Sequence, residues 1–329
     1  MNPPVLESLA DKLLEKIRQR PEQYFDPVKL SENLKTTEKN IIAAISLLRS
    51  WGYSIKADKE GRYAFVAAPD SFLSAEILHG LDTRLIARKI YSFQTIQSTN
   101  AIACQLASAK ASEGTLVIAE HQTRGRGRLG RQWYSPKNVG LYCSIILNPK
   151  IHPTLAPGIS IMTAVALADT IASYDDMEIK IKWPNDILIS RLKVAGILTE
   201  LSAEIDRVEY VIVGVGVNIN QKRADFPAEL REFATSVRIG AKEKIRRVEF
   251  LQIFLKNFEK EYILFKKLGL REARKKFLKY SFLHNQEVKL KMGRKLIIGA
   301  VLDIDEFGRL VLDTRDGIMS FNSGEVTTH

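Results

Sequence analysis

The chain has 329 residues, which favours two or three domains and is ample for a large hydrophobic core. Its composition, 45% apolar and 26% charged, is ordinary for a globular protein and excludes a low-complexity chain. The net charge is +11, and +8 of it falls in residues 221–329. Such a basic excess can attract nucleic acid or an acidic protein, and it is also typical of a solvated helix surface, so charge alone does not identify a partner.

The two cysteines, Cys104 and Cys143, belong to no CxxC motif and to no cluster with histidine. A disulfide framework or a structural zinc site is therefore not expected, and a reducing compartment fits. The N-terminus lacks an apolar signal region, and no apolar run approaches the ~18 residues that a membrane span requires. We expect a cytoplasmic protein with no membrane association.

Residues 1–66 have the pattern of a small helical domain. Apolar residues recur with a helical period over 4–20, and two shorter helical segments follow over 28–34 and 36–53. A strand, a turn near Gly61 and a second strand complete the region. Two short helices separated by a tight turn and followed by a hairpin predict a winged helix-turn-helix, with a linker over 67–70.

Residues 67–280 alternate between strands and helices, which predicts a mixed α/β domain. The expected strands are residues 90–97, 115–122, 141–148, 178–190, 193–204 and 208–220. The expected helices are residues 98–111, 157–174 and one or two within the lysine- and arginine-rich stretch 248–280. Short strands with glycine turns then occupy 281–329 and predict a small β-barrel.

The stretch GRGRLGR, residues 125–131, follows an expected strand and is therefore a loop at a strand end. Glycine allows the backbone to approach a ligand closely, and arginine offers a planar charged fork that fits carboxylate or phosphate oxygens. The pattern is neither a GxxxxGK[ST] loop nor a dinucleotide-binding turn. Such a loop can enclose a small anion, bind a nucleic-acid backbone or form a solvated charge run, and the motif alone leaves these open.

The pentapeptide KWPND, residues 182–186, interrupts a strand pattern with a proline. Asp186, directly after Asn185, is suited to holding Mg²⁺ beside phosphates, and it is equally suited to an Asx turn that caps the strand. Lys193 lies between apolar residues, where a lysine is usually a surface residue, and Gly196 permits close backbone approach nearby.

Two further motifs lie on either side of GRGRLGR, KWPND and Lys193 in the sequence. Ser98, Thr99 and Asn100 start an expected helix, where capping explains one of the three. In VGVGVNIN, two glycines alternate with valines before Asn218, which makes room for a ligand or for a closely packed helix.

The order STN, GRGRLGR, KWPND, KVAG and GVGVN closely resembles that of the biotin–protein ligases. With the winged helix in front and the barrel behind, the chain resembles the bifunctional bacterial type, both ligase and biotin-operon repressor. The resemblance covers nearly all 329 residues. It implies an α+β protein with an N-terminal winged helix (1–66), a central mixed α/β class II synthetase-like ligase domain (67–280) and a C-terminal SH3-like β-barrel (281–329).

The family makes biotinyl-5′-adenylate from biotin and MgATP, releases pyrophosphate, and transfers biotin to one lysine of a biotin carboxyl carrier protein, such as a subunit of acetyl-CoA carboxylase. The resemblance therefore implies ATP, Mg²⁺ and biotin as cofactors and substrate. Because the carboxylate and the α-phosphate are both anions, arginines and a lysine around them suit the chemistry. The resemblance also implies a homodimer formed by edge-to-edge extension of the middle domain's sheet.

The resemblance assigns the site residues by position. Biotin is expected to contact Ser98, Thr99, Asn100, Gln122, Gly125, Arg126, Lys193 and Gly196. ATP is expected to contact Arg128, Arg131, Trp133, Lys182, Asn185 and Asn218. The expected catalytic residues are Lys193, Arg126, Arg128 and Asp186, with Asp186 as the ligand of Mg²⁺.

DNA binding is less clearly indicated. Thr36, Thr37, Lys39 and Asn40 are the base-reading candidates, but residues 41–44 of the same helix are apolar. The net charge of residues 1–70 is only +1, which gives little attraction to phosphates. An operator-binding domain and a structural or dimerisation appendage both remain open. Arg124 also departs from the family, which often has a small residue there.

Three other functions compete with the ligase. A lipoate–protein ligase would carry an RRxxGGG-type motif, which is absent. A non-catalytic biotin-sensing transcription regulator would not need both Lys193 and Asp186. A basic RNA-binding module would expose aromatic residues, whereas Phe254, Phe258 and Phe265 have the helical spacing of a core.

Overall fold

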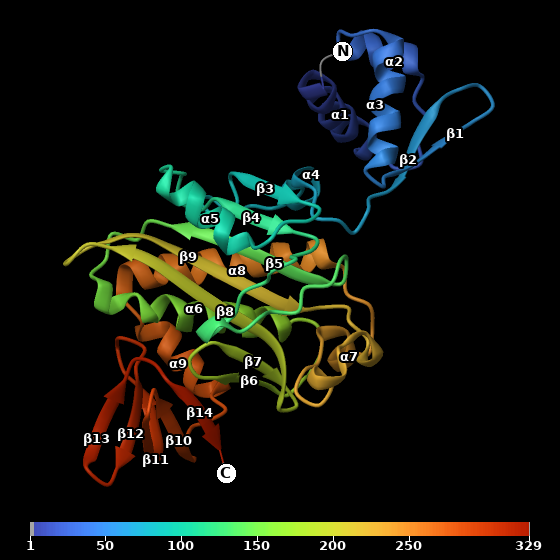
Figure 1. Ribbon diagram of the computed structural model, residues 1–329. Coiled ribbons are helices and arrows are strands. Elements are labelled where there is room, and N and C mark those ends of the chain that lie inside the picture. The colour runs from blue at the N-terminus through green and yellow to red at the C-terminus, as the bar shows by residue number, and fades with distance from the viewer. Residues whose placement is uncertain (1–2, 329) are drawn as a thin grey trace. The chain divides into compact units, whose positions relative to one another are not determined.

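The computed structural model describes residues 3–328, which divide between Ser71 and Phe72 into two compact units (Figure 1). The first unit contains three helices and a two-stranded antiparallel sheet. Their bounds are α1 (Pro3–Arg18), α2 (Pro27–Asn33), α3 (Glu38–Ser50), β1 (Ser54–Ala57) and β2 (Tyr63–Ala67). These elements lie where the apolar periodicity predicted them.

The local sequence explains where these helices begin. The Asp26 carboxylate accepts a hydrogen bond from the backbone of Val28 at 2.8 Å and so caps α2, while the Thr37 hydroxyl caps α3. Leu13 and Ile17 of α1 are buried in the core of this unit, as is Ile45 of α3. The unit therefore has a hydrophobic core of its own.

The second unit is built on a seven-stranded sheet with the strand order β3-β4-β5-β9-β8-β7-β6. Its strands are β3 (Ile90–Phe93), β4 (Leu116–Ala119), β5 (Gly140–Leu147), β6 (Ile179–Lys182), β7 (Asp186–Ile189), β8 (Leu192–Ala203) and β9 (Val208–Asn218). β3 and β4 are parallel, and every other neighbouring pair is antiparallel. The KWPND stretch forms the turn between β6 and β7, which the sequence had indicated as an interrupted strand.

Helices cover both faces of this sheet. α5 packs against β4, β5 and β9 through a small cluster that includes Ala103 and Val117, while α6 and α8 cover the other face in the main core. The α-helices of the unit are α4 (Ser74–Leu78), α5 (Thr99–Ser108), α6 (Pro157–Ile171), α7 (Val237–Ala241), α8 (Arg247–Leu268) and α9 (Arg271–Tyr280). Single 3₁₀ turns lie at Arg128–Gly130, Pro153–Leu155, Arg223–Asp225 and Ala228–Leu230. The aromatic residues of α8 are buried, as their spacing predicted.

One expectation was wrong. The helical stretch Pro153–Ile171 has 19 residues, and by length and composition alone it could cross a membrane. The sequence analysis expected no such run. Most of it is buried within the second unit, where α6 packs on α8 and on the sheet. Its uniform apolarity is that of a central core helix, which is in contact with protein all round.

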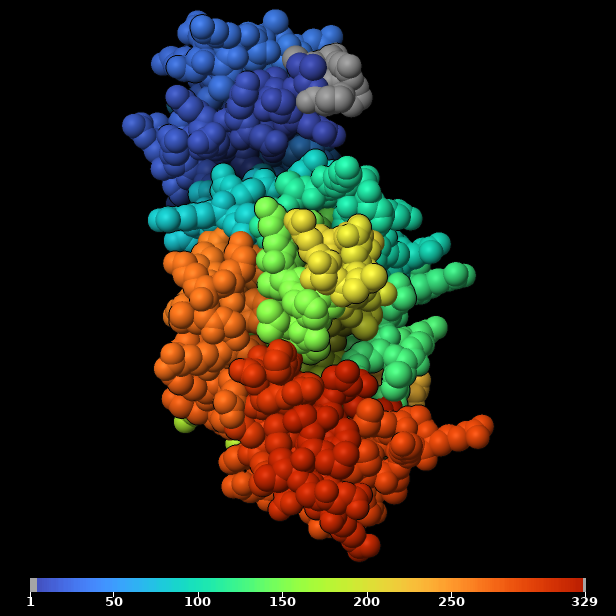
Figure 2. Space-filling model, turned by 90° about the vertical axis from the view of Figure 1, so that its left-hand side faces the viewer, coloured from blue at the N-terminus to red at the C-terminus, as the bar shows by residue number. Residues whose placement is uncertain are grey.

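A second sheet of five strands ends the chain, in the order β13-β12-β11-β10-β14. Its strands are β10 (Glu287–Met292), β11 (Lys295–Ile304), β12 (Leu310–Thr314), β13 (Gly317–Phe321) and β14 (Glu325–Thr328). β14 was not expected from the sequence. The sheet shares its hydrophobic core with the large sheet and its helices, and Figure 2 shows it in red against them. The domain boundary near residue 280 therefore stays a prediction.

Candidate active site

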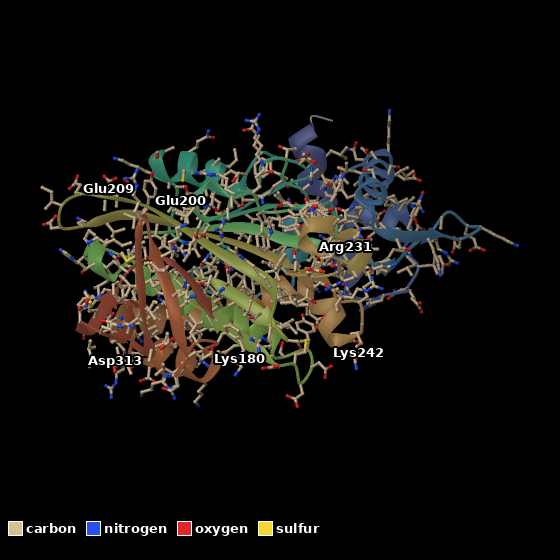
Figure 3. The ribbon with its side chains drawn as sticks, turned by 60° about the horizontal axis from the view of Figure 1, so that its bottom comes forward. Lys180, Glu200, Glu209, Arg231, Lys242 and Asp313 are labelled. Atoms are coloured by element: carbon tan, nitrogen blue, oxygen red, sulfur yellow. The ribbon has the colours of Figure 1, made fainter. Side chains whose placement is uncertain are left out.

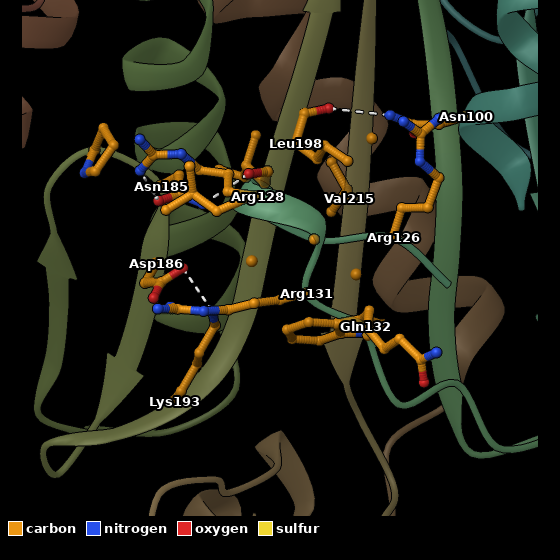
Figure 4. Close-up of a pocket in the computed structure, with 18 of the residues that line it drawn as sticks. Asn100, Arg126, Arg128, Arg131, Gln132, Asn185, Asp186, Lys193, Leu198 and Val215 are labelled. Carbon is orange, nitrogen blue, oxygen red and sulfur yellow. Dashed lines mark hydrogen bonds and ion pairs between the residues drawn. The ribbon is translucent and has the colours of Figure 1, made fainter. Parts of the chain in front are cut away.

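A cavity of about 260 Å³ opens over β8 and β9 (Figure 4). Three distant stretches of the chain surround it: the start of α5, the loop that follows β4, and the β6–β7 turn. Among the predicted site residues, those that line it are Ser98, Thr99, Asn100, Gln122, Arg126, Arg128, Arg131, Trp133, Lys182, Asn185, Asp186, Lys193 and Gly196. Folding thus brings together almost every residue that the motif order had singled out.

The GRGRLGR loop is a short hairpin rather than an open coil. Arg126 pairs with Gln132 as an isolated antiparallel bridge, and the Gly127 amide donates to the Arg131 carbonyl at 2.7 Å. The tip has left-handed backbone at Leu129 (φ 56°) and Gly130 (φ 76°), a conformation that glycine adopts without cost. The hairpin directs its arginines towards the cavity.

One end of the cavity is a buried network of neutral polar groups. The Gln122 side-chain oxygen accepts hydrogen bonds from the Thr99 amide (2.8 Å) and hydroxyl (3.1 Å). The Ser144 hydroxyl lies within hydrogen-bond distance of both Thr99 Oγ1 (2.8 Å) and Asn100 Oδ1 (2.6 Å). Ser98 completes this end, and all of these side chains are nearly inaccessible to solvent. Such an arrangement can recognise a neutral polar group through fixed donors and acceptors.

The other end is charged. Lys193 Nζ lies 2.7 Å from Asp186 Oδ1, and Figure 4 shows the two side chains pointing toward each other. Arg128 donates to Asn185 Oδ1 at 3.1 Å, and Lys182 completes the group. Burial lowers the pKa of Arg128, although nearby Asp186 opposes this effect. Several cations with one carboxylate suit a ligand that carries phosphate.

A β-bulge aims Lys193 into the cavity. Opposite β7, Leu188 pairs with Lys193 and Ile187 pairs with Ala195, so that Val194 is the extra residue. Without the bulge, Lys193 would share the face of Ala195, which lies in the core. With it, the lysine lies on the same face as Gly196. Bulges commonly redirect a side chain in this way beside active sites.

Close packing explains the glycines of β9. A Cβ added at Gly216 would lie 2.6 Å from the Trp133 indole, and a Cβ at Gly214 would collide with Asn100. These glycines therefore admit two neighbouring side chains, and Trp133 forms part of the cavity wall. Lys193 Nζ lies 5.4 Å from the centre of the Trp133 ring.

Two predicted residues do not line the cavity. Gly125 is buried and closely packed, since a Cβ there would approach the Trp133 carbonyl to 2.5 Å. Asn218 is buried, and its side chain bonds to the Thr235 carbonyl. The DNA-binding candidates lie in the first unit. There, Asn40 donates to the Thr36 hydroxyl, Thr37 caps α3, and Lys39 is exposed.

Four functional neighbours escaped the sequence analysis. Ser144 lies in an apolar strand, and Trp183 lines the cavity while its indole donates to the Gly308 carbonyl. Glu200 bonds to Asn100 Nδ2 (2.7 Å) and forms an ion pair with Arg126 (3.0 Å). Glu325 of β14 forms an ion pair with Arg131. Their partners lie far away in sequence, so no local signal marks these contacts.

The donor set is suitable for Mg²⁺ only in part. Residues 3–328 contain no group of three or more His, Cys, Asp or Glu side chains arranged to hold a metal. Asp186 provides one carboxylate beside cations that would hold phosphates. Mg²⁺ is commonly held by one or two carboxylates together with substrate phosphates, so Asp186 fits an ion that arrives with a nucleotide.

Known proteins resemble the chain in both sequence and structure. Residues 92–218 match the biotin/lipoate A/B protein ligase family, and residues 283–327 match the biotin protein ligase C-terminal domain. The bifunctional ligase/repressor BirA of Bacillus spizizenii is 35% identical over 97% of this chain and 98% of its own length. BirA of Escherichia coli is 29% identical over 91% of each chain.

A solved structure is similar to the chain in both fold and sequence. The biotin protein ligase from Aquifex aeolicus in complex with biotin and ATP has a TM-score of 0.64 and 30% identity, over 74% of this chain and 99% of that one. The Bacillus relative is similar over nearly the full length, and both ligase domains match. The chain therefore belongs to the biotin–protein ligase family and is a biotin ligase enzyme.

Proposed function

We propose that this ligase activates biotin with ATP to give biotinyl-5′-adenylate and pyrophosphate, and then transfers biotin to a lysine of a biotin carboxyl carrier protein, such as a subunit of acetyl-CoA carboxylase. The observation that carries the proposal is the cavity with a neutral polar end and a cationic end. Biotin combines a neutral polar ring system with a carboxylate, and ATP brings phosphates to that carboxylate. The Aquifex ligase structure contains biotin together with ATP, which supports binding of the same two substrates here.

The proposed role of each site residue follows from its chemistry. Ser98, Thr99, Asn100, Gln122 and Gly196 would hold the biotin rings, with Gly125 supporting the loop beneath. Arg126 and Lys193 would lie at the biotin carboxylate and the α-phosphate, where positive charge offsets the repulsion of two anions as the carboxylate oxygen attacks phosphorus and pyrophosphate leaves. Arg128, Arg131, Trp133, Lys182 and Asn185 would hold the nucleotide.

Asp186 would hold Mg²⁺ together with the phosphates. When bound, the ion neutralises phosphate charge and polarises the phosphoryl oxygens. The ion pair with Lys193 then gives the carboxylate a second role, because it keeps the ammonium group at the meeting point of the two substrates.

Pyrophosphate exchange into ATP tests this function. The purified chain is given Mg²⁺ and biotin, lipoate or no acid. Exchange that depends on biotin alone is expected, because lipoate presents no ureido ring to the polar end. Exchange with lipoate would instead assign a lipoate ligase, and a folded protein without exchange would contradict adenylation.

We also propose a repressor role for the first unit, in which α2 and α3 followed by the β1–β2 pair would serve as a winged helix-turn-helix. The BirA relatives are bifunctional ligase/repressors. Thr36, Thr37, Lys39 and Asn40 would then contact operator DNA. The C-terminal sheet would correspond to an SH3-like barrel, giving domains over 1–66, 67–280 and 281–329.

A homodimer is also part of the proposal. β8 extends beyond β7: its pairing with that strand ends at Gly196, and among residues 3–328 no strand covers the same edge of Leu198–Ala203. Leu201 on this stretch is 49% exposed, and Figure 3 shows Glu200 and Glu209 at the same end of the sheet. An unpaired edge is a template for pairing with a second copy. We place the protein in the cytoplasm, where its carrier would be made.

A further inference from the structure

A buried serine outside the cavity holds the side chain of a residue that lines it. Ser135 follows the GRGRLGR loop, is 4% exposed and does not line the cavity. Its hydroxyl accepts a hydrogen bond from Gln122 Nε2 at 3.1 Å and donates to the Trp133 carbonyl at 3.0 Å. Gln122 does line the cavity and belongs to its neutral polar end.

The directions of these hydrogen bonds follow from the groups that make them. The Trp133 carbonyl can only accept, so the single hydroxyl hydrogen of Ser135 points there and the serine oxygen receives a hydrogen from Gln122. The Thr99 main-chain amide can only donate, so the Gln122 atom 2.8 Å from it is the side-chain oxygen. The planar amide of Gln122 is therefore held at both ends, and this also fixes the direction of the one hydrogen of Nε2 that remains.

The Ser135 hydroxyl occupies a well-supported position. The carbonyl of the same residue lies 2.6 Å from His121 Nδ1, which must donate because a carbonyl oxygen only accepts. Gly125 leaves room for the contact with Gln122, because a Cβ there would lie 2.7 Å from Ser135 Oγ and 3.2 Å from Gln122 Nε2. The Gln122 main chain pairs separately with Ile96. Backbone contacts thus fix both residues, and the serine hydroxyl then orients the glutamine side chain.

We propose that Ser135 is a positioning residue for biotin recognition and acts through Gln122. This inference rests on the proposed function, in which Gln122 contacts the biotin rings. A polar group that is already oriented in the free protein costs less to order when a ligand binds. Without the Ser135 hydroxyl, the Gln122 amide is held by its oxygen end alone, so biotin binding should weaken. Affinity for ATP should not change, because Lys182 and Asn185 come from the β6–β7 turn.

The test measures the dissociation constant for biotin by calorimetry in the full chain without ATP, so that no turnover is needed. Ser135→Ala is expected to raise this constant about 3- to 10-fold, as the loss of one neutral hydrogen bond does elsewhere.

Thr170→Val is the matched control. The Thr170 hydroxyl also accepts from a side-chain amide, that of Asn257 at 3.1 Å, and donates to a carbonyl, that of Ala166 at 2.7 Å. It is fully buried in α6 and does not line the cavity. The biotin dissociation constant of this variant should equal that of the wild type.

A double-mutant cycle shows whether Ser135 acts through Gln122. Gln122→Met should weaken biotin binding by itself, and Ser135→Ala added to it should change the dissociation constant less than about 2-fold. In pyrophosphate exchange, Ser135→Ala should raise KM for biotin and leave kcat and KM for ATP close to the wild-type values. Equal effects of Ser135→Ala with and without Gln122→Met would overturn the proposal, as would unchanged biotin affinity or a change in KM for ATP alone.

Failure of the proposed function would look different. Biotin binding without pyrophosphate exchange in the wild-type chain would contradict adenylation, and the binding measurements would still decide this inference. A folded wild-type chain that binds no biotin would contradict the proposed function as a whole. Hydrogen exchange of the Gln122 side-chain amide would then be decisive: it should accelerate in Ser135→Ala, and an unchanged rate would overturn the proposal.

Discussion

At the scale of single residues, Lys193 is the group whose charge the proposed adenylation needs most. It points at Asp186 from a bulge and lies beside Trp133. We expect Lys193→Met to lower kcat for biotin-dependent pyrophosphate exchange about 10²- to 10³-fold, as loss of a preorganised electrostatic group does elsewhere. Lys180→Met is the control, because Lys180 lies on β6 and does not line the cavity. A Lys193 variant that keeps most of the exchange rate would contradict the assignment.

Arg128 has a different role, in retaining the intermediate. It lies on the loop, donates to Asn185, and loses part of its hydration on burial. We expect Arg128→Gly to release biotinyl-5′-adenylate and to biotinylate exposed lysines of an unrelated protein such as serum albumin. Arg124→Gly in the same loop, an exposed position away from the cavity, should not. Adenylate retained as long as in the wild type would exclude this role.

At the scale of elements, a buried ion pair connects three segments of the second unit. Arg247 at the start of α8 lies 2.6 Å from Glu120, and both side chains are almost fully buried. The other oxygen of Glu120, which directly follows β4, accepts from the Phe72 amide at 2.8 Å. The ion pair therefore supports the segment after β4 that leads into the GRGRLGR loop.

Removing one partner of such a pair leaves a buried charge. We expect Arg247→Met to lower the free energy of unfolding by about 3–5 kcal/mol. Lys266→Met, which removes a partly exposed pair with Glu113, should cost less than about 1 kcal/mol. Denaturant unfolding followed by tryptophan fluorescence in a Trp51→Phe background reports the second unit alone, since Trp51 is the tryptophan of the first unit. Equal losses in both variants would show that burial does not decide the cost.

At the scale of the whole molecule, the two units have separate cores, so the proposed activities should separate. A chain of residues 72–329 is expected to keep biotin-dependent pyrophosphate exchange and to lose operator binding. In the full chain, operator affinity should fall with salt, with a slope of log K against log[salt] of about −0.9 for each phosphate contact. DNA binding by 72–329, or the lack of a salt dependence in the full chain, would place the DNA contacts elsewhere.

Much of the fold and most of the proposed site followed from the sequence. Helical periodicity, strand alternation and caps such as Thr37 act over a few residues, so α1, α3 and the central strands lay where expected. Motifs such as GRGRLGR and KWPND carry their chemistry within five to seven residues, and their order along the chain sufficed to group them. The features that the sequence did not reveal depend on the register between paired strands and on contacts between residues that are distant in sequence.

Only the tertiary structure decided the surroundings of those motifs. The bulge at Val194 depends on how β7 pairs with β8, and the main-chain partner of Lys193 depends on which segment replaces β9 beside it. Glu325 meets Arg131 because β14 pairs with β10, and α6 lies in a core although its composition is that of a membrane span. Local sequence determined which residues carry the chemistry, because their types and spacing encode it. Long-range packing determined which of them touch, because contacts between distant segments form only when the whole unit folds.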